Sequence, residues 1–232
     1  MTPSERSYKS IVFDLDGTLV DSYLALTRAI NRARGEFGID ELSGEQIRLM
    51  VGEGVEILLE RAFAPHPLPD GARDLFENTY DEICCEESRI LDDVERTLAI
   101  LTDRGFPMAV CTNKPTGFSV KILRHLNLAG HFRAVVGPDL AGTRKPDGAH
   151  LLHALSFLGA GPDEALYVGD MVLDVLAARN AGMDVAVVAT GSCSASELVS
   201  ADPDYFLGRF SDVLDVLHAS EPERGPHGDW PA

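Results

Sequence analysis

The 232-residue sequence lacks any run of 18 or more apolar residues, and its first nine residues contain no apolar signal segment. We therefore expect no membrane-spanning helix, no secretory leader and a cytoplasmic location. Cysteine is also scarce. The four cysteines show no metal-ligand spacing and are too few for a disulfide scaffold in a chain of this length. Free thiols in a reducing compartment are the expected state.

Positive charge is in short supply as well. Lys and Arg number 20 against 37 Asp and Glu, which gives a formal net charge of −17. Nucleic acids and anionic membranes need a basic patch, so neither is an expected partner. An anionic substrate would need a local cation. Only four of the basic residues are lysines, which makes a lysine at a predicted site informative. No feature indicates an oligomeric state.

Hydrophobic residues make up 45% of the chain, which is enough for a sizeable core. Short apolar segments rich in β-branched residues recur along it, and their continuous apolar character predicts strands of a parallel sheet buried on both faces. These segments are 10–14, 107–111, 134–137, 165–169, 185–189 and the weaker 205–207. Helical patterns over 116–126, 146–158 and 173–181 separate the later strands. The alternation predicts an α/β fold with a doubly wound (Rossmann-like) sheet.

One connection is too long for a simple crossover, since residues 20–91 contain no convincing strand. Helical patterns occupy it instead, over 24–37, 44–50, 55–63 and 72–85. We therefore expect a core domain over 1–20 and 92–219 and an inserted helical cap domain over 21–91. The segment 220–232, rich in Pro, Gly and charge, is expected to be a disordered tail.

Acidic pairs follow two of the predicted strands. Asp14 and Asp16 end the first strand and start on one face of an extended segment, while Asp170 and Asp174 follow a later strand at helical spacing. Carboxylates gathered at a sheet's ligand-binding edge suit Mg²⁺. Taken alone, the first pair also fits a polar turn, and the second fits N-capping of a helix by Asp170.

Two further strand ends and loops carry polar groups. Thr112 and Asn113 follow the second core strand, where a hydroxyl and the amides that open a helix can hold an anion. Lys145, one of the four lysines, precedes a helix. Ordinary helix capping and a solvated basic loop remain open for these positions. Together the groups supply a nucleophile, an acid/base, a hydroxyl, a cation and metal ligands, the inventory for phosphoryl transfer.

The segment from Asp14 to Ser22, DLDGTLVDS, and three later segments occur in the family order of the haloacid dehalogenase (HAD) superfamily. The later segments are Thr112-Asn113-Lys114, Lys145-Pro146 and the Gly169-Asp170 pair with Asp174. The sequence resembles this superfamily over residues 10–217, and within it the phosphoglycolate phosphatase branch. The resemblance implies a Mg²⁺-dependent phosphatase, a phosphoric monoester hydrolase acting on a small phosphorylated metabolite, with phosphoglycolate favoured.

The resemblance also implies roles for the site residues. Asp14 would attack phosphorus and form an aspartyl-phosphate, and Asp16 would act as the acid and base. Asp14, the backbone carbonyl of Asp16 and Asp170 would hold Mg²⁺, with Asp174 as a ligand or a support behind them. Thr112, Asn113 and Lys145 would bind the phosphoryl oxygens.

The cap of this branch closes over the site and reads the leaving group. Gly52, Glu53 and Gly54 lie between two predicted cap helices and resemble the substrate-reading loop, although a plain helix–helix turn fits them too. Arg48 is a candidate for meeting a substrate carboxylate, as are Arg28 and Arg32.

Several alternatives remain. The metal-independent dehalogenases of this superfamily are discounted, because they lack an acid at the position where this sequence has Asp16. A Schiff-base hydrolase would need a cap lysine, and none lies between Lys9 and Lys114. A β-phosphoglucomutase-like phosphomutase would carry a cap histidine near Leu26. That phosphomutase and a pyrophosphatase of the same superfamily stay open, as does a different class, a phospho-accepting signalling or binding module.

Overall fold

The computed structural model describes residues 7–218, so the predicted tail at 220–232 lies outside the described residues. Its centre is a six-stranded sheet with the order β5-β4-β1-β6-β7-β8, and every strand pairs in parallel with its neighbours. The strands are β1 (Ser10–Phe13), β4 (Met108–Cys111), β5 (Ala134–Val136), β6 (Ala165–Gly169), β7 (Asp184–Val188) and β8 (Tyr205–Leu207). The predicted doubly wound parallel sheet is confirmed.

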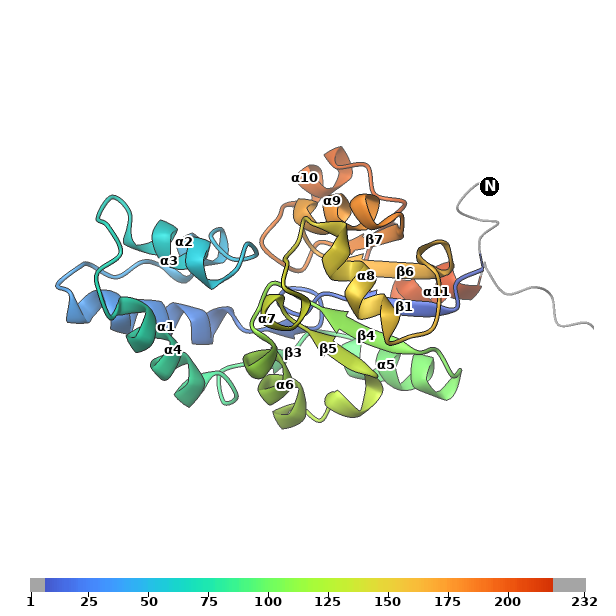
Figure 1. Cartoon of the computed structure of the whole chain (residues 1–232), viewed down its shortest axis with the longest axis horizontal. Helices are drawn as coiled ribbons and strands as arrows, with labels where there is room; N and C mark the ends of the chain where they lie inside the picture. Colours follow the sequence, from blue (N-terminus) through green and yellow to red (C-terminus); the bar gives the residue numbers. More distant parts are fainter. Residues whose placement is uncertain (1–6, 219–232) are drawn as a thin grey trace, which may run out of the picture.

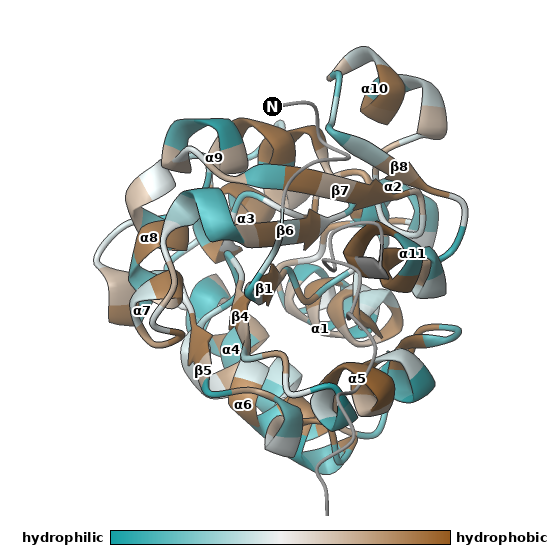
Figure 2. Ribbon diagram, turned by 90° about the vertical axis from the view of Figure 1, so that its right-hand side faces the viewer, coloured by the Kyte–Doolittle hydropathy of each residue, from teal (hydrophilic) through white to brown (hydrophobic). Residues whose placement is uncertain are grey.

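Helices cover both faces of this sheet because its strands are apolar on both sides. In β1, Ile11 and Phe13 pack into one hydrophobic cluster with α5, α6 and α11, while Val12 packs into a second with α8, α9 and α10. Figure 2 shows the hydrophobic strands between these helices. The core helices are α5 (Val94–Asp103), α6 (Thr116–His125), α7 (Pro138–Ala141), α8 (Gly148–Ser156), α9 (Val172–Ala181), α10 (Ala195–Ser200) and α11 (Val213–His218).

Residues 21–91, for which we keep the name cap, lie to one side of the sheet in Figure 1 and carry four helices. They are α1 (Tyr23–Glu36), α2 (Gly44–Arg48), α3 (Val55–Phe63) and α4 (Ala72–Ile83). The expectation of no strand between 20 and 91 is wrong in detail. β2 (Val20–Asp21) and β3 (Arg89–Ile90) pair antiparallel where the chain leaves and re-enters the core. Two-residue strands are too short to leave a sequence period.

The sheet order brings three strand ends together at the edge nearest the cap. β1 lies between β4 and β6, so the residues that follow these three strands are neighbours although they are far apart in sequence. Ligands bind at this edge in open parallel sheets.

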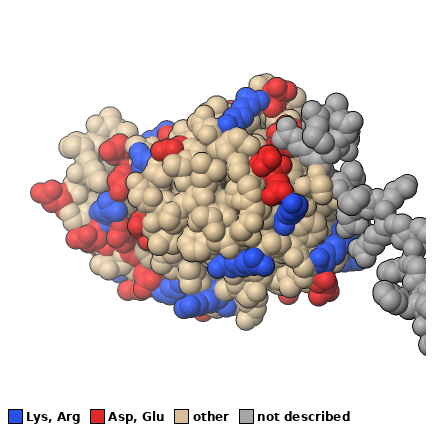
Figure 3. Space-filling model, turned by 45° about the vertical axis from the view of Figure 1, so that its right-hand side comes forward, with Lys and Arg blue, Asp and Glu red and all other residues tan. Residues whose placement is uncertain are grey.

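On the face shown in Figure 3, basic and acidic side chains are interspersed, and the basic ones do not form one continuous patch. No helix within residues 7–218 combines the length and apolar character needed to cross a membrane.

Candidate active site

Asp14, Thr112 and Asp170 follow directly after β1, β4 and β6. The backbone amide of Asp14 still donates to the carbonyl of Val168 at 2.9 Å, so its position is fixed by the sheet itself. All three side chains are almost completely buried. The parallel register therefore places a carboxylate, a hydroxyl and a second carboxylate side by side.

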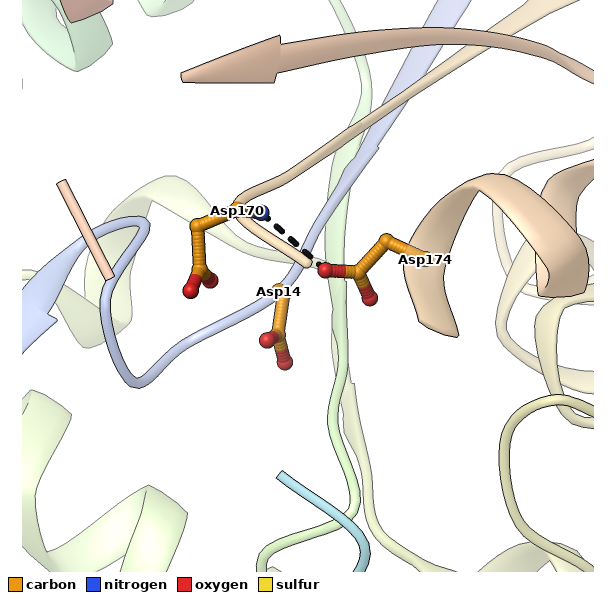
Figure 4. Close-up of side chains that lie close together, drawn as sticks. All are labelled: Asp14, Asp170 and Asp174. Atoms are coloured by element: carbon orange, nitrogen blue, oxygen red, sulfur yellow. Dashed lines mark hydrogen bonds between the residues drawn. The ribbon is translucent and has the colours of Figure 1, made fainter. Parts of the chain in front are cut away.

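Three carboxylates converge at this point. One oxygen from each of Asp14, Asp170 and Asp174 lies within 4.8 Å of the other two, and Figure 4 shows the three side chains directed toward a common space. The Oδ2 atom of Asp170 is buried and has no hydrogen-bond partner among the described residues. A buried carboxylate oxygen without a partner is costly, and a divalent cation would satisfy it.

Asp174 differs from the other two acids because both of its oxygens are already engaged. Its Oδ2 accepts hydrogen bonds from the backbone amides of Asp170 at 3.0 Å and Met171 at 2.9 Å, at the start of α9. Its Oδ1 lies 2.7 Å from Lys145 Nζ and 3.1 Å from the hydroxyl of Tyr167. The N-cap residue of α9 is Met171, and Asp174 binds the amides before the helix from its first turn, so the capping alternative for Asp170 is wrong.

Lys145 lies inside the acid cluster. Its ammonium group is 2.9 Å from Asp14 Oδ1 and 2.7 Å from Asp174 Oδ1, and the residue is 3% exposed. The alternative of a solvated basic loop is therefore wrong. Burial alone would lower the pKa of Lys145, but the charges of Asp14 and Asp174 outweigh it, and that pKa is raised. Lys145 stays charged and is the local cation that the net charge of −17 requires.

Burial also changes the pKa values of the neighbouring carboxyl groups. It raises the pKa of Asp14 to about 6, with Lys145 opposing the shift and the charge of Asp174 adding to it. Burial, followed by the charges of Asp174 and Asp14, also raises the pKa of Asp170 well above its usual range. One ammonium group does not balance three buried carboxylates, which is the electrostatic condition for binding a divalent cation.

Asp16 stands apart from the three clustered acids and has its own partners. Its Oδ2 accepts a hydrogen bond from Lys114 Nζ at 2.6 Å, and its Oδ1 accepts one from Ser22 Oγ at 2.5 Å. Asp16 and Asp14 nevertheless line the same cavity, which Thr112 and Asn113 also line. A group that binds to Asp14 is therefore within the same enclosure as the Asp16 carboxylate.

Asn113 links the site to the cap. Its side-chain amide donates to the carbonyls of Gly52 at 3.0 Å and Lys145 at 3.1 Å, and its Oδ1 accepts from the amide of Lys145. α6 begins at Thr116 with Pro115 before it, so neither Thr112 nor Asn113 caps that helix. Their polar groups serve the cavity and the loops around it instead.

The predicted cap residues divide into two sets. Gly52 and Gly54 line the cavity. A Cβ atom on Gly52 would come within 2.4 Å of two side-chain atoms of Met171, so this loop contacts the core there, and its φ of +128° favours glycine. Glu53 is not among the cavity-lining residues and forms an ion pair with Arg61.

Arg48 reaches across from the cap to the core. Its guanidinium donates to the carbonyl of Gly191, at 3.0 Å from Nε and 2.8 Å from Nη2, and to that of Thr190. It also stacks 4.5 Å above the ring of Tyr23. Arg28 pairs with Glu87, and Arg32 is exposed. The structure therefore places these three arginines outside the residues that line the cavity.

The loop that Arg48 holds packs directly on Asp170. A Cβ atom on Gly191 would lie 1.5 Å from Asp170 Oδ2, and one on Gly17 would lie 2.6 Å from the same oxygen. Thr18 donates to the other oxygen, Oδ1, at 2.8 Å. Glycines at positions 17 and 191 therefore leave room for Asp170 Oδ2, a buried oxygen that accepts no hydrogen bond from the described residues, and this is consistent with a metal ligand.

Sequence reasoning missed four residues of the site: Lys114, Ser22, Thr18 and Tyr167. Three of them lie within the motif segments, and the scarcity of lysine was an available signal for Lys114. No sequence signal pointed to Tyr167, because it occupies an ordinary strand position within β6.

Comparison with known proteins shows the family to which the chain belongs. Residues 11–188 match the family described as haloacid dehalogenase-like hydrolase. A phosphoglycolate phosphatase of Photorhabdus laumondii is 33% identical over 218 residues, which cover 91% of this chain and 93% of that protein. One of Caulobacter vibrioides is 38% identical over 188 residues, which cover 78% and 79%. The crystal structure of a predicted phosphoglycolate phosphatase from Haemophilus somnus superposes with a TM-score of 0.83 at 30% identity, covering 93% and 99%.

The chain belongs to the haloacid dehalogenase-like hydrolases. Within them it falls in the phosphoglycolate phosphatase-like branch and is a phosphatase, a hydrolase of phosphoric monoesters.

Proposed function

We propose that this phosphatase hydrolyses a small phosphate monoester with the help of Mg²⁺, through an aspartyl-phosphate on Asp14. The observation that carries the proposal is the convergence of Asp14, Asp170 and Asp174 around an unpartnered Asp170 oxygen beside Lys145. Phosphoglycolate is the first substrate to test, because the relatives that cover most of the chain carry that name.

The donor set fits a magnesium ion. Asp14 and Asp170 would hold it with the backbone carbonyl of Asp16, and Asp174, whose oxygens are occupied, would fix the direction of its neighbours. When bound, Mg²⁺ would supply positive charge that lowers the repulsion between the carboxylates and a dianionic phosphate.

The chain's own residues then divide the reaction into two steps. An oxygen of Asp14 forms a bond to phosphorus as the bond to the leaving oxygen breaks, and Asp16 gives that oxygen a proton. In the second step Asp16 takes a proton from a water molecule, which attacks phosphorus and releases inorganic phosphate and free Asp14. Lys145, the Thr112 hydroxyl and the backbone amide of Asn113 would hold the phosphoryl oxygens.

The surroundings of Asp16 support this role. Ser22 and Lys114 hold both of its oxygens in the cavity beside Asp14, which fixes the direction from which a proton is exchanged. The cap position where a phosphomutase would carry a histidine is Leu26, an apolar residue that lines the same cavity. It offers no group for proton transfer, which favours hydrolysis over mutase chemistry.

The loop over Gly52, Glu53 and Gly54 remains our proposed reader of the leaving group, with Gly52 and Gly54 at the cavity wall. That Glu53 reads the leaving group stays a prediction, although its side chain pairs with Arg61. For Arg48, whose guanidinium binds the Gly191 carbonyl, we now expect a role in holding the cap to the core instead.

A turnover panel tests the proposed function. Purified protein with Mg²⁺ is given p-nitrophenyl phosphate, phosphoglycolate, glucose 1-phosphate and pyrophosphate, with Asp14→Asn as the control. We expect release of inorganic phosphate from the monoesters by the wild type alone. Isomerisation of glucose 1-phosphate without phosphate release, or preference for pyrophosphate, would contradict the proposal.

A further inference from the structure

The cavity above Asp14 has two chemically different ends. Its floor consists of the polar strand-end residues of the core, which include Asp14, Asp16 and Thr112. Its other end, called the wall below, is formed by cap helices and by α6 of the core. The residues that line this second end are apolar or aromatic: Leu26, Val55, Leu58, Phe76, Tyr80 and Phe118.

The aromatic part of this wall spans both domains. Phe76 and Tyr80 of α4 stack with their ring centroids 5.7 Å apart, and Tyr80 meets Phe118 of α6 edge to face at 5.1 Å. Phe76 and Tyr80 are each 1% exposed, so packing holds the rings in place. The wall is therefore preformed and rigid, as ligand-binding surfaces commonly are.

Positive charge is scarce at this end. Among the described residues that line the cavity, the one cation is Lys114, and it is already paired with Asp16 at 2.6 Å. Arg48 is bound to backbone carbonyls, and Arg144 lies 3.6 Å from Glu56 beside a neighbouring cavity. A carboxylate on the leaving group would thus enter an apolar enclosure without an unpaired cation, which is unfavourable.

We propose that this wall binds an aliphatic or aromatic leaving group, so that the enzyme accepts alkyl and aryl phosphate monoesters with more than two carbons. This inference rests on the proposed function but differs from it in the leaving group: phosphoglycolate, named for the relatives, would be a slower substrate than an alkyl phosphate of equal length. The reaction is the one given above: the bond from phosphorus to the leaving oxygen breaks, Asp16 protonates that oxygen, and the product is an apolar alcohol or phenol.

A chain-length series tests the proposal. kcat/KM is measured for n-alkyl phosphates from methyl to hexyl and for ω-carboxyalkyl phosphates, of which phosphoglycolate is the shortest. Each methylene buried against the wall should raise kcat/KM about fourfold until the cavity is filled, since burial of one such group favours binding by a constant amount. The kcat/KM of each ω-carboxyalkyl phosphate should be lower than that of the alkyl phosphate of equal length.

The failures are distinguishable. A flat alkyl series, or carboxylates that outrank their alkyl counterparts, would overturn this inference while leaving a working phosphatase. No turnover of any ester, p-nitrophenyl phosphate included, would overturn the proposed function and this inference with it.

Variants locate the effect at the wall. Val55→Thr keeps the shape of a partly exposed lining residue but adds a hydroxyl, and it should reduce the rise per methylene. Val199→Thr makes the same change at a 60% exposed position of α10 that does not line the cavity. It should leave the series unchanged. Equal slopes for Val55→Thr and the wild type would contradict a binding role for this wall.

Discussion

Lys145 holds its ammonium group 2.9 Å from a carboxylate oxygen of Asp14, and both residues are almost completely buried. The two come from distant segments, a loop before α8 and the end of β1. Their contact pairs the proposed nucleophile with a buried cation, which we propose also binds a phosphoryl oxygen.

Replacement of Lys145 by methionine tests this pairing. Lys145→Met removes the charge but keeps most of the length, and it should lower kcat by about 10²–10³, the usual cost of losing one stabilising donor. Lys145 also lowers the pKa of Asp14, so the acidic limb of the kcat/KM profile should move to higher pH. Lys9→Met, at an exposed ion pair with Glu164, is the control and should change neither value. An unshifted limb in Lys145→Met would argue against the contact.

Metal dependence follows from the three carboxylates. EDTA should abolish turnover and Mg²⁺ should restore it, while excess Ca²⁺ should inhibit because its larger and looser shell misplaces the nucleophile. Burial raises the pKa of Asp14 to about 6, so protons should compete with the ion below that value. Mg²⁺ affinity, measured by calorimetry, should weaken as pH falls through 6. Full activity after exhaustive chelation would rule the metal role out.

The contact of Arg48 with the Gly191 loop makes a prediction about the cap. Arg48→Ala removes hydrogen bonds between the cap and the loop that packs on Asp170, and it should lower kcat/KM about tenfold for all substrates alike. Arg48→Lys keeps the charge but loses the planar guanidinium, so its kcat/KM should lie between those of the wild type and Arg48→Ala. A changed order of substrates instead of a uniform loss would show that Arg48 reads the leaving group.

His150 provides a test of the core that is independent of activity. Burial, with the charge of Lys145 as a second cause, lowers the pKa of His150 from 6.5 to about 4. The unfolded chain binds this proton below about pH 6.5 and the folded chain only below about 4, so stability falls as pH drops between these values. From pH 7 to pH 5 this loss should be about 2 kcal/mol.

Urea unfolding at the two pH values measures it. His150→Leu should lose that part of the pH dependence, and His66→Gln, at an exposed position, should keep it. The same pH dependence in His150→Leu and in the wild type would contradict the burial argument.

The sequence predicted the parallel sheet and the positions of Asp14, Thr112 and Asp170 because strand period and strand ends are local properties. It did not predict that Lys114 pairs with Asp16 or that Arg48 binds the Gly191 carbonyl. Those contacts depend on how cap and core meet, which no local pattern encodes. The strands β2 and β3 were not predicted for a similar reason, because they form only by pairing between residues about 70 apart in sequence.

The most direct test of the account separates Asp14 from Asp16 by rapid mixing with p-nitrophenyl phosphate. Asp14→Asn removes the nucleophile. Asp16→Asn keeps it, and nitrophenolate leaves without a proton donor, so the phosphoenzyme should form while its hydrolysis stays slow. Mg²⁺ affinity of both variants is measured alongside to exclude loss of the ion. We predict a stoichiometric burst of nitrophenol from Asp16→Asn and none from Asp14→Asn; equal bursts from both, or a burst from Asp14→Asn alone, would contradict Asp14 as the nucleophile.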